Sequence, residues 1–387
     1  MKKKNLVYLD YAATTPIDPR VLRTMVKAET DLFANTASAH GSGRQADSVL
    51  SDCRARMARL IGALPEEIIF TASATESNNL SLKGLVSANN GKHIIVSMIE
   101  HDCILGTAKY LEGLGVKVDY LSVDSNGLVD LDQLKKLINK DTLLVSVMMA
   151  NNEIGTIEPV AEIGRICHST GVYFQTDAAQ TFGKMPIDVN QMGIDLLTAS
   201  SHKIYGPKGA GLLYVRKGLK IDPLFHGGGH ELGLRSSTVN LPAIVAFVKA
   251  SEIACRGMEK ENKRLIPLRD KLITGVLKTI PNSCLNGDAQ KRLANNANFR
   301  FDGIEGEALL YMLDGVGIAV STASACSSPK LQPSHVLLAL GLSAEQAHGS
   351  LRVSLGRWTK VKEIDYLLSV LPGVVKKLRE ISPIKLL

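Results

Sequence analysis

Two residues of this 387-residue chain have the chemical character and spacing of a reactive pair, a lysine and an upstream aspartate. Lys203 lies in the segment Ser200–Gly209 (SSHKIYGPKG), and Asp177 opens the segment Asp177–Gln180 (DAAQ). A lysine amine forms a Schiff base with an aldehyde, and a carboxylate can keep a pyridine nitrogen protonated. Both properties suit pyridoxal 5′-phosphate, because its protonated ring withdraws electrons from the bound reactant.

Each of the two residues also has a simpler explanation. Most lysines are solvated surface charges, and an aspartate in this position can cap the next helix. Their sequence context favours the chemical interpretation. Lys203 comes just after an apolar run, with Ser200 and His202 beside it as further phosphate donors. Asp177 ends the run 172–176 (VYFQT), where a carboxylate is expected to be buried.

A candidate phosphate-binding segment lies further upstream. Residues 72–78 (ASATESN) follow a predicted strand and open a predicted helix. The free N–H groups at a helix start, together with the Thr75 hydroxyl, can hold a phosphate. An ordinary N-cap explains the same residues. Only the combination with Lys203 and Asp177 favours the phosphate interpretation.

Three further polar residues lie in strand-like runs or follow predicted strands. His101 could stack on a flat cofactor and move protons near neutral pH, and a satisfied structural histidine is the alternative. Asn152 could reach a cofactor or a substrate, although turn formation explains it as well. Arg352 could pair with a substrate carboxylate through its planar guanidinium, and a structural salt bridge is the alternative.

One cysteine differs from the other cysteines. Cys326 lies in residues 321–333, a stretch rich in Ser, Ala and Pro that predicts an exposed loop. An accessible thiol can act as a nucleophile, and an accidental exposed cysteine is the alternative. No C-x-x-C pair occurs, so neither a metal site nor a redox dithiol is expected. The remaining cysteines are interpreted as packing residues: Cys53, Cys103, Cys167, Cys255 and Cys284.

The elements that must position these residues follow an alternating pattern between residues 68 and 215. Short aliphatic runs alternate with segments of helical period, which predicts a mainly parallel sheet covered by helices on both faces. Ligands of such sheets bind beyond the carboxyl ends of the strands. The predicted helices include Thr75–Ser87, Leu131–Leu137 and Val160–Ser169, with Gly171 as the last helix's C-cap. The predicted strands are Ile68–Thr71, His93–Ser97, Val116–Leu121, Thr142–Met148, Val172–Thr176, Leu196–Ala199 and Gly211–Val215.

The pattern changes from Glu252 onward. A long charged helix is predicted over 252–279, another over 305–313, and two further helices before the C-terminus. The fold class is therefore α/β, with a seven-stranded sheet in a large domain and a smaller α+β domain. We place the large domain at residues 14–258 and the small domain, which carries the Cys326 loop, at residues 1–13 and 259–387.

Composition excludes several classes of partner. The net charge is +7, but Lys and Arg are scattered among acidic residues, so no nucleic-acid partner is expected. The longest apolar stretches are too short to span a bilayer. Asp10 interrupts the N-terminus before an apolar core forms, which makes a signal peptide unexpected. With so few, dispersed cysteines, the prediction is a cytoplasmic protein.

Several short segments are individually common but occur in a specific order along nearly the whole chain: Tyr8–Pro16, Ala74–Asn79, Glu100–His101, Asn151–Gly155, Asp177–Gln180, Ser201–Gly209, His226–Glu231, Ser324–Ser327 and Arg352–Arg357. In this combination the chain resembles the pyridoxal-phosphate-dependent cysteine desulfurases of the IscS/NifS group. That group has the fold-type I aminotransferase architecture. The resemblance therefore implies the PLP-dependent transferase fold type I.

The resemblance also implies individual roles. Lys203 would carry the cofactor and move protons at the substrate Cα, while Asp177 would pair with the pyridinium nitrogen. Gln180 would contact the ring hydroxyl, and His101 would stack on the ring and take part in catalysis. Residues expected to hold the phosphate are Ala74, Thr75, Ser200, His202 and, from the other subunit of a homodimer, Thr238. Residues expected to hold the substrate carboxylate are Asn35, Asn152 (also a cofactor contact) and Arg352.

The implied reaction converts L-cysteine to L-alanine. The Cys326 thiolate would attack the substrate sulfur and pass the resulting persulfide to an acceptor, as expected for iron–sulfur cluster assembly. Alternatives are a selenocysteine lyase, a sulfur donor to another pathway, or a catalytically silent relative that binds partners. The chain departs from the family pattern at four positions. Serine replaces glycine at Ser73, Ser201 and Ser237, and Leu232 stands where arginine is common.

Overall fold

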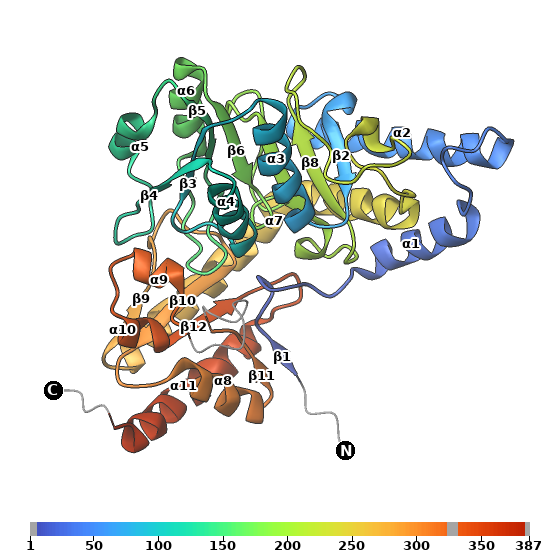
Figure 1. The fold of residues 1–387 in the computed structure, drawn as a ribbon. Helices are drawn as coiled ribbons and strands as arrows, with labels where there is room; N and C mark the ends of the chain where they lie inside the picture. Colours follow the sequence, from blue (N-terminus) through green and yellow to red (C-terminus); the bar gives the residue numbers. More distant parts are fainter. Residues whose placement is uncertain (1–5, 323–331, 384–387) are drawn as a thin grey trace.

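The computed structural model describes residues 6–322 and 332–383. Its main element is a seven-stranded sheet in the order β2-β8-β7-β6-β5-β3-β4, with helices on both faces (Figure 1). Only β8 runs antiparallel to its neighbours β2 and β7, and the remaining pairs are parallel. The predicted fold class is confirmed. The strands are β2 (Ile68–Thr71), β3 (His93–Ser97), β4 (Lys117–Leu121), β5 (Thr142–Ser146), β6 (Tyr173–Asp177), β7 (Leu196–Ser200) and β8 (Gly211–Val215).

Side-chain alternation explains why this sheet is covered on both faces. Neighbouring residues point to opposite sides of a strand, so Phe70 and Val145 pack in one core while Ile69 and Leu144 pack in another. All four side chains are fully buried or nearly so. The helices that contact the sheet are α2 (Gly41–Ile61), α3 (Ala74–Ala88), α4 (Asp102–Gly113), α5 (Leu131–Leu137) and α6 (Val160–Thr170). The helix α1 (Pro19–Asp31) instead packs on the long helix described below.

Local signals in the sequence fix several of the helix ends. The Ser73 side chain accepts a hydrogen bond from the backbone N–H of Glu76 and so caps α3. Gly171 ends α6 with φ of 71°, in the left-handed region that glycine adopts most easily. Gly211 allows the start of α3 to approach the sheet, because a Cβ there would lie 2.6 Å from the Ser73 carbonyl carbon.

A separate hydrophobic core lies in the C-terminal part of the chain. It joins residues from 265 onward with Val7 and Leu9 near the N-terminus. The short strand β1 (Val7–Tyr8) pairs in parallel with β11 (Ile318–Ala319) (Figure 1). The other elements of this part are β9 (Ser283–Leu285), β10 (Asn296–Phe301), α8 (Gly306–Gly315), α9 (His335–Ala339), α10 (Ala344–His348), β12 (Ser350–Ser354) and α11 (Val361–Ile381).

The helix α7 (Leu241–Thr279) connects the two parts of the chain and differs from its prediction. It begins at Leu241 rather than at Glu252, because the apolar stretch before Glu252 packs against α1 and α2 as a helix. Residue 259, where the sequence changes character, lies inside this helix. Among the described residues after α8, three helices occur rather than the predicted two. Two of them, α9 and α10, are only five residues long, which is too short for a helical period to be recognised in the sequence.

Two residues of the predicted exposed loop are buried. Ser321 and Thr322 are 2% and 7% exposed, and the backbone of Ser321 exchanges two hydrogen bonds with Arg352. Small polar residues can be buried in a strand-like pairing, which composition alone does not distinguish from a loop. Residues 323–331, including Cys326, lie outside the described residues. In the described part of the chain, every helix is too short or too polar to cross a bilayer.

Candidate active site

A cavity of about 200 Å³ lies beyond the carboxyl ends of β6 and β7. We refer to it below as the catalytic cavity. Most residues singled out in the sequence meet there, although they come from different elements. The lining includes Ala74, Thr75, His101, Asn152, Asp177, Gln180, Ser200, His202, Lys203 and Arg352. Parallel strands deliver their C-terminal residues to one edge of the sheet, which explains how distant segments meet.

Asp177 is the last residue of β6, and its carboxylate is 5% exposed. One oxygen accepts a hydrogen bond from Asn78 Nδ2 at 2.7 Å, and the other accepts one from the backbone N–H of Ala179 at 2.8 Å. Asn78 Oδ1 in turn accepts from Gln175 Nε2 at 3.1 Å. This buried network fixes the carboxylate's orientation toward the cavity.

Lys203 ends the short 3₁₀ helix η2 (Ser201–Lys203) that follows β7. Its amine donates hydrogen bonds to the backbone carbonyls of Ala12 and Ala13 at 2.7 and 2.8 Å. Gln180 Nε2 donates to the same Ala12 carbonyl at 2.9 Å. The N-terminal segment, otherwise part of the second core, therefore closes one side of the cavity and holds the amine.

The start of α3 and the end of β7 supply the polar groups that could bind a phosphate. Thr75 is exposed at the first turn of α3, where backbone N–H groups are free to bind an anion. His202 accepts or donates a hydrogen bond with Thr14 Oγ1 at 3.0 Å. Burial lowers the pKa of His202 to about 4, and the nearby charges of Lys203, Lys208 and Lys184 act in the same direction.

His101 lines the cavity as the N-cap of α4, where its Nδ1 accepts a hydrogen bond from the backbone N–H of Cys103 at 3.1 Å. Beside it, burial and the charge of Asp177 raise the pKa of Glu100 well above its usual range.

Cys103 also lines the cavity, which corrects its interpretation as a packing residue only. Burial, followed by the charge of Asp177, raises the pKa of its thiol to about 12, so that thiol is a poor nucleophile.

Arg352, on β12, is placed where it could bind a substrate carboxylate and also forms a structural salt bridge, the two roles considered for it above. It lines the cavity, and its Nη2 also forms an ion pair with Asp10 at 3.0 Å. Its Nη1 donates to the carbonyl of Asn152 at 3.1 Å. Its Nε is buried and has no hydrogen-bond partner among the described residues. The guanidinium is therefore held in place by neighbours and retains unpaired N–H donors, Nε among them.

Two predicted site residues do not line the catalytic cavity. Asn35 is exposed and accepts a hydrogen bond from the backbone N–H of Ala37 at 2.9 Å. Thr238 is also exposed and is the last residue of a loop at residues 226–238. Within one subunit, neither side chain contributes to the site. Cys326 lies outside the described residues.

The loop 226–238 is attached to the large sheet by buried charges. Glu231 is 6% exposed and accepts two hydrogen bonds from the Arg54 guanidinium at 2.8 and 2.9 Å, and one from Phe70 N–H at 2.7 Å. A second ion pair joins Arg235 to Glu76, on the first turn of α3, at 2.8 Å. These pairs connect the loop to the helix start that lines the catalytic cavity.

The departures from the family pattern differ in their effect on this geometry. Ser73 has φ of −168°, an extended conformation that serine adopts without strain. Ser237 has φ of 143°, a conformation that normally requires glycine. Leu232, with φ of 59°, is likewise left-handed. Ser73 therefore leaves the start of α3 unaffected, whereas Ser237 introduces strain in the loop 226–238. Leu232 adds none relative to arginine, because both residues meet the same steric cost at that φ.

Comparison with known proteins identifies the family. The aminotransferase class-V family matches residues 7–367. The chain belongs to that family. It is 49% identical to a protein named cysteine desulfurase IscS from Dictyoglomus turgidum, over 99% of this chain and 98% of the relative. The resemblance to the IscS/NifS group is confirmed.

Solved structures of class-V proteins support the same assignment. A NifS-like protein superposes with a TM-score of 0.90 at 39% identity, covering 96% of this chain and 100% of the other. The structure titled SspA in complex with cysteine superposes with a TM-score of 0.79 at 36% identity, covering 92% of this chain and 100% of the other. The seven-stranded sheet and its helices thus have the expected class-V architecture.

Class-V aminotransferases and cysteine desulfurases are pyridoxal-phosphate enzymes. The donor set of the catalytic cavity fits that cofactor. An amine, a carboxylate, an imidazole and the N-terminus of a 15-residue helix line the same 200 Å³ space. An amine suits the aldehyde, the carboxylate suits the pyridine nitrogen, and the helix start suits the phosphate.

Some residues of the site carry no signal that sequence reasoning could interpret reliably. Asn78 lies one helical turn beyond Ala74, so it faces the sheet once α3 is recognised, but its partner Asp177 is 99 residues away. Ala12 and Ala13 act through backbone carbonyls, to which residue type is almost irrelevant. Cys103 has the spacing of an ordinary core residue. Only the folded chain reveals these contacts.

Proposed function

We propose that this chain is a pyridoxal-phosphate-dependent cysteine desulfurase, which removes sulfur from L-cysteine and leaves L-alanine. The observation that carries the proposal is the convergence of Lys203, Asp177 and Arg352 on one cavity from three separate elements. An amine for the cofactor, a carboxylate for its ring and a guanidinium for a substrate carboxylate are the groups that an amino-acid reaction on this cofactor needs.

When bound, the cofactor would withdraw electrons from the substrate Cα and so stabilise the loss of its proton. Lys203 would hold the cofactor and then carry that proton, and Asp177 would keep the ring nitrogen protonated through its fixed carboxylate. The cofactor phosphate would be held at the start of α3 by Ala74 and Thr75 and by Ser200 and His202. The ring would be held by the remaining cofactor-contacting residues, His101, Asn152 and Gln180.

Arg352 is proposed to bind the substrate carboxylate. Its ion pair with Asp10 and its hydrogen bond to Asn152 fix the guanidinium plane, and the buried Nε is one of the donors left for a ligand. A buried donor without a partner is costly, so a carboxylate there would gain from satisfying it. Asn35 is exposed. It would contribute to substrate binding when a bound substrate or a second subunit brings it close to Arg352.

Cys326 is proposed to accept the sulfur. Its thiolate would attack the substrate sulfur, so that an S–S bond forms while the substrate C–S bond breaks. The bonding electron pair stays with the substrate carbon, which takes up a proton to give alanine. Ser321, five residues before Cys326, pairs with Arg352 through two backbone hydrogen bonds, so the segment leading to Cys326 starts at the catalytic cavity. Cys103, with its raised pKa, is not suited to this role.

The proposal includes several features of the assembly. The active form is a homodimer, in which the exposed Thr238 reaches the phosphate site of the other subunit. Residues 14–258 form the large domain, and residues 1–13 and 259–387 form the small one; the separate core around Val7, Leu9 and residues from 265 onward supports this division. The protein acts in the cytoplasm and passes its persulfide sulfur to an acceptor for iron–sulfur cluster assembly.

Turnover with two cysteine variants tests the function. Wild-type protein mixed with L-cysteine and a reductant should release alanine and sulfide in equal amounts. Without reductant, the peptide containing Cys326 should become heavier by one sulfur atom in a mass spectrum. Cys326→Ala should bind the cofactor but form no persulfide, and the control Cys103→Ser should retain turnover. Wild-type sulfide release by Cys326→Ala would disprove the assigned role. Faster turnover of selenocysteine than of cysteine would favour a selenocysteine lyase.

A further inference from the structure

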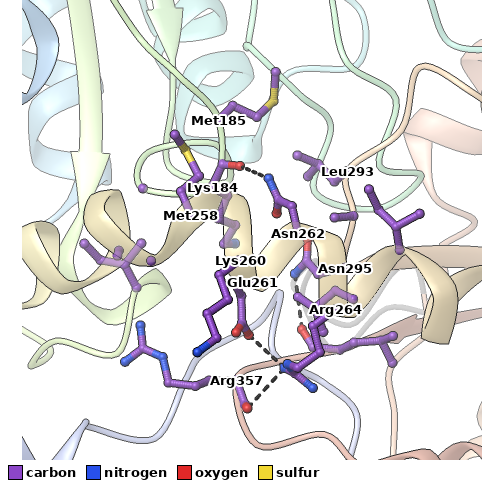
Figure 2. A pocket seen from close by; sticks show the side chains of 18 of the residues that line it. Lys184, Met185, Met258, Lys260, Glu261, Asn262, Arg264, Leu293, Asn295 and Arg357 are labelled. Carbon is purple, nitrogen blue, oxygen red and sulfur yellow. Dashed lines mark hydrogen bonds and ion pairs between the residues drawn. The ribbon is translucent and has the colours of Figure 1, made fainter.

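A second cavity, of about 350 Å³, lies along the middle of α7. We call it the α7 cavity, and Figure 2 shows part of its lining. Its walls come from α7, the segments 183–185 and 204–205, and the C-terminal segments 292–295 and 355–357. It shares no lining residue with the catalytic cavity. Its volume is within the range of small-molecule sites, which often occur where separate cores meet.

The lining of the α7 cavity is mainly apolar but carries an excess of positive charge. Apolar side chains come from every wall, including Met185, Met258 and Leu293, which Figure 2 labels. The cationic residues of the lining are Arg20, Lys184, Lys260, Arg264, Arg292 and Arg357. The only acidic residue of the lining is Glu261, and it forms an ion pair with Arg264 at 2.8 Å.

Most of these arginines already have partners that hold them in place. Arg20 and Arg357 both form ion pairs with Asp18, at 2.8 and 2.6 Å. Arg292 donates to the backbone carbonyls of Ile154, Asn286 and Asp288 and so stabilises a turn. These guanidinium groups make the cavity electropositive. Because they already have partners, we do not expect them to be the main groups that bind a ligand.

Lys184 differs from the arginines. Its side chain is partly buried, and its amine lies 3.5 Å from Gln180 Oε1, with no carboxylate within 4.0 Å among the residues that the structure describes. Burial, with a contribution from the charge of Lys203, lowers the pKa of Lys184 to about 7. Even a partly buried ammonium group loses some of its hydration, so an anion beside it would be stabilised.

We propose that the α7 cavity is a binding site for a small organic monoanion, a carboxylate with an apolar body, whose charged group pairs with Lys184. The apolar walls exclude a strongly hydrated ligand such as free phosphate, and the positive lining disfavours a cation. An unbranched carboxylate places its charge at one end and its hydrocarbon on the Met and Leu side chains. This inference does not depend on the proposed desulfurase activity, because the two cavities are lined separately.

A ligand there would also lie next to the cofactor-binding residues. Gln180 is hydrogen-bonded to the Ala12 carbonyl, which also accepts from Lys203. Lys184 contacts Gln180 on the opposite side. Three successive hydrogen bonds, through Gln180 and the Ala12 carbonyl, thus connect Lys184 with Lys203. A carboxylate that draws Lys184 away from Gln180 would therefore change the surroundings of Lys203.

Calorimetric titration of the full-length holoenzyme with octanoate tests the site. Wild-type protein should bind one octanoate per subunit. Lys184→Met removes the ammonium group and keeps the apolar chain, so octanoate binding should weaken about tenfold or more. Binding of the uncharged analogue 1-octanol should not weaken in the same variant. Equal octanoate affinity in Lys184→Met and wild type would overturn the assignment of the anion partner.

A second pair of variants tests the location. Gly257 lies on α7 in the lining, and a Cβ there would meet no atom within 4 Å. Gly257→Leu should fill the cavity and abolish octanoate binding without disrupting the helix, since leucine has the higher helix propensity. Gly373, in α11, also has open space around its Cβ and lies outside the lining. Gly373→Leu should bind octanoate normally. Binding that survives in Gly257→Leu, or no binding by wild type at millimolar octanoate, would overturn the proposal.

Discussion

The ion pair between Arg54 and Glu231 provides a sharp test of how the loop 226–238 is held. Both side chains are largely buried, with exposures of 11% and 3%. The arginine donates two hydrogen bonds to the carboxylate and a third to the Ile68 carbonyl. Arg54→Met would keep much of the packing against the Phe70 ring, over which the guanidinium lies at 5.3 Å. The variant therefore removes mainly the charge.

The expected loss of stability follows from the partners that remain. In Arg54→Met, the Glu231 carboxylate keeps only the Phe70 N–H as a donor and stays buried. Removing one member of a buried pair in this way costs about 3–5 kcal/mol. Removing both charges, with Arg54→Met and Glu231→Gln together, should cost less than the sum of the single changes, by about 1–3 kcal/mol.

Urea unfolding at one fixed protein concentration measures these differences. The control is Lys263→Met, which breaks an ion pair with Glu259 whose side chains are 74% and 81% exposed. That change should alter stability by less than about 1 kcal/mol. If Arg54→Met cost no more than Lys263→Met, or if the two buried changes were simply additive, the buried pair would not be what attaches the loop.

Three other predictions concern single residues of the site. The pKa of His202 is about 4 in the folded protein, whereas the ordinary pKa of histidine, expected in the unfolded chain, is about 6.5. Between these two pH values the unfolded chain therefore binds more protons than the folded one. The free energy of unfolding therefore falls as the pH falls from about 7 to about 5. In cofactor-free protein, His202→Gln should make that fall smaller by about 2 kcal/mol, measured by urea unfolding. Asn78→Leu removes the donor to Asp177 and should weaken cofactor binding about tenfold or more in a fluorescence titration. The control is Asn79→Ala, which removes a hydrogen bond to the Thr75 carbonyl and should leave cofactor binding unchanged. Ser237→Gly should raise the free energy of unfolding by about 1 kcal/mol, because φ of 143° suits glycine; an unchanged or lower value would show that serine is not strained there.

Much of the fold could be predicted because its signals are local. Alternating apolar runs define the strands β2, β3 and β8 with the bounds that the structure has, and helix signals such as Gly171 mark where α6 ends. The predicted start of α7 at Glu252 is wrong, because the apolar residues from Leu241 onward belong to the same helix. The predicted end of β5 at Met148 is also wrong, because the apolar pattern of Thr142–Met148 continues past Ser146, the last residue of the strand. Pairing depends on a neighbouring strand, which the local sequence does not contain.

The candidate site divides in the same way. Residue types and their local context were enough to indicate which groups are available: the Lys203 amine, the Asp177 carboxylate, the hydroxyls at the start of α3 and the Arg352 guanidinium. Motif order along the chain indicated the family. Side-chain chemistry and strand-end position are properties of a short segment, so they can be recognised before the chain is folded.

Which of these groups meet, and what charges they carry, depends on the folded chain. Asn78 contacts Asp177, the N-terminal carbonyls hold Lys203, and Arg352 pairs with Asp10, across sequence separations of 99 to 342 residues. The pKa values of Lys184 and Cys103 depend on burial and on neighbours contributed by other elements. Electrostatic energies and desolvation depend on distance through space, and the packing of two separate cores fixes that distance.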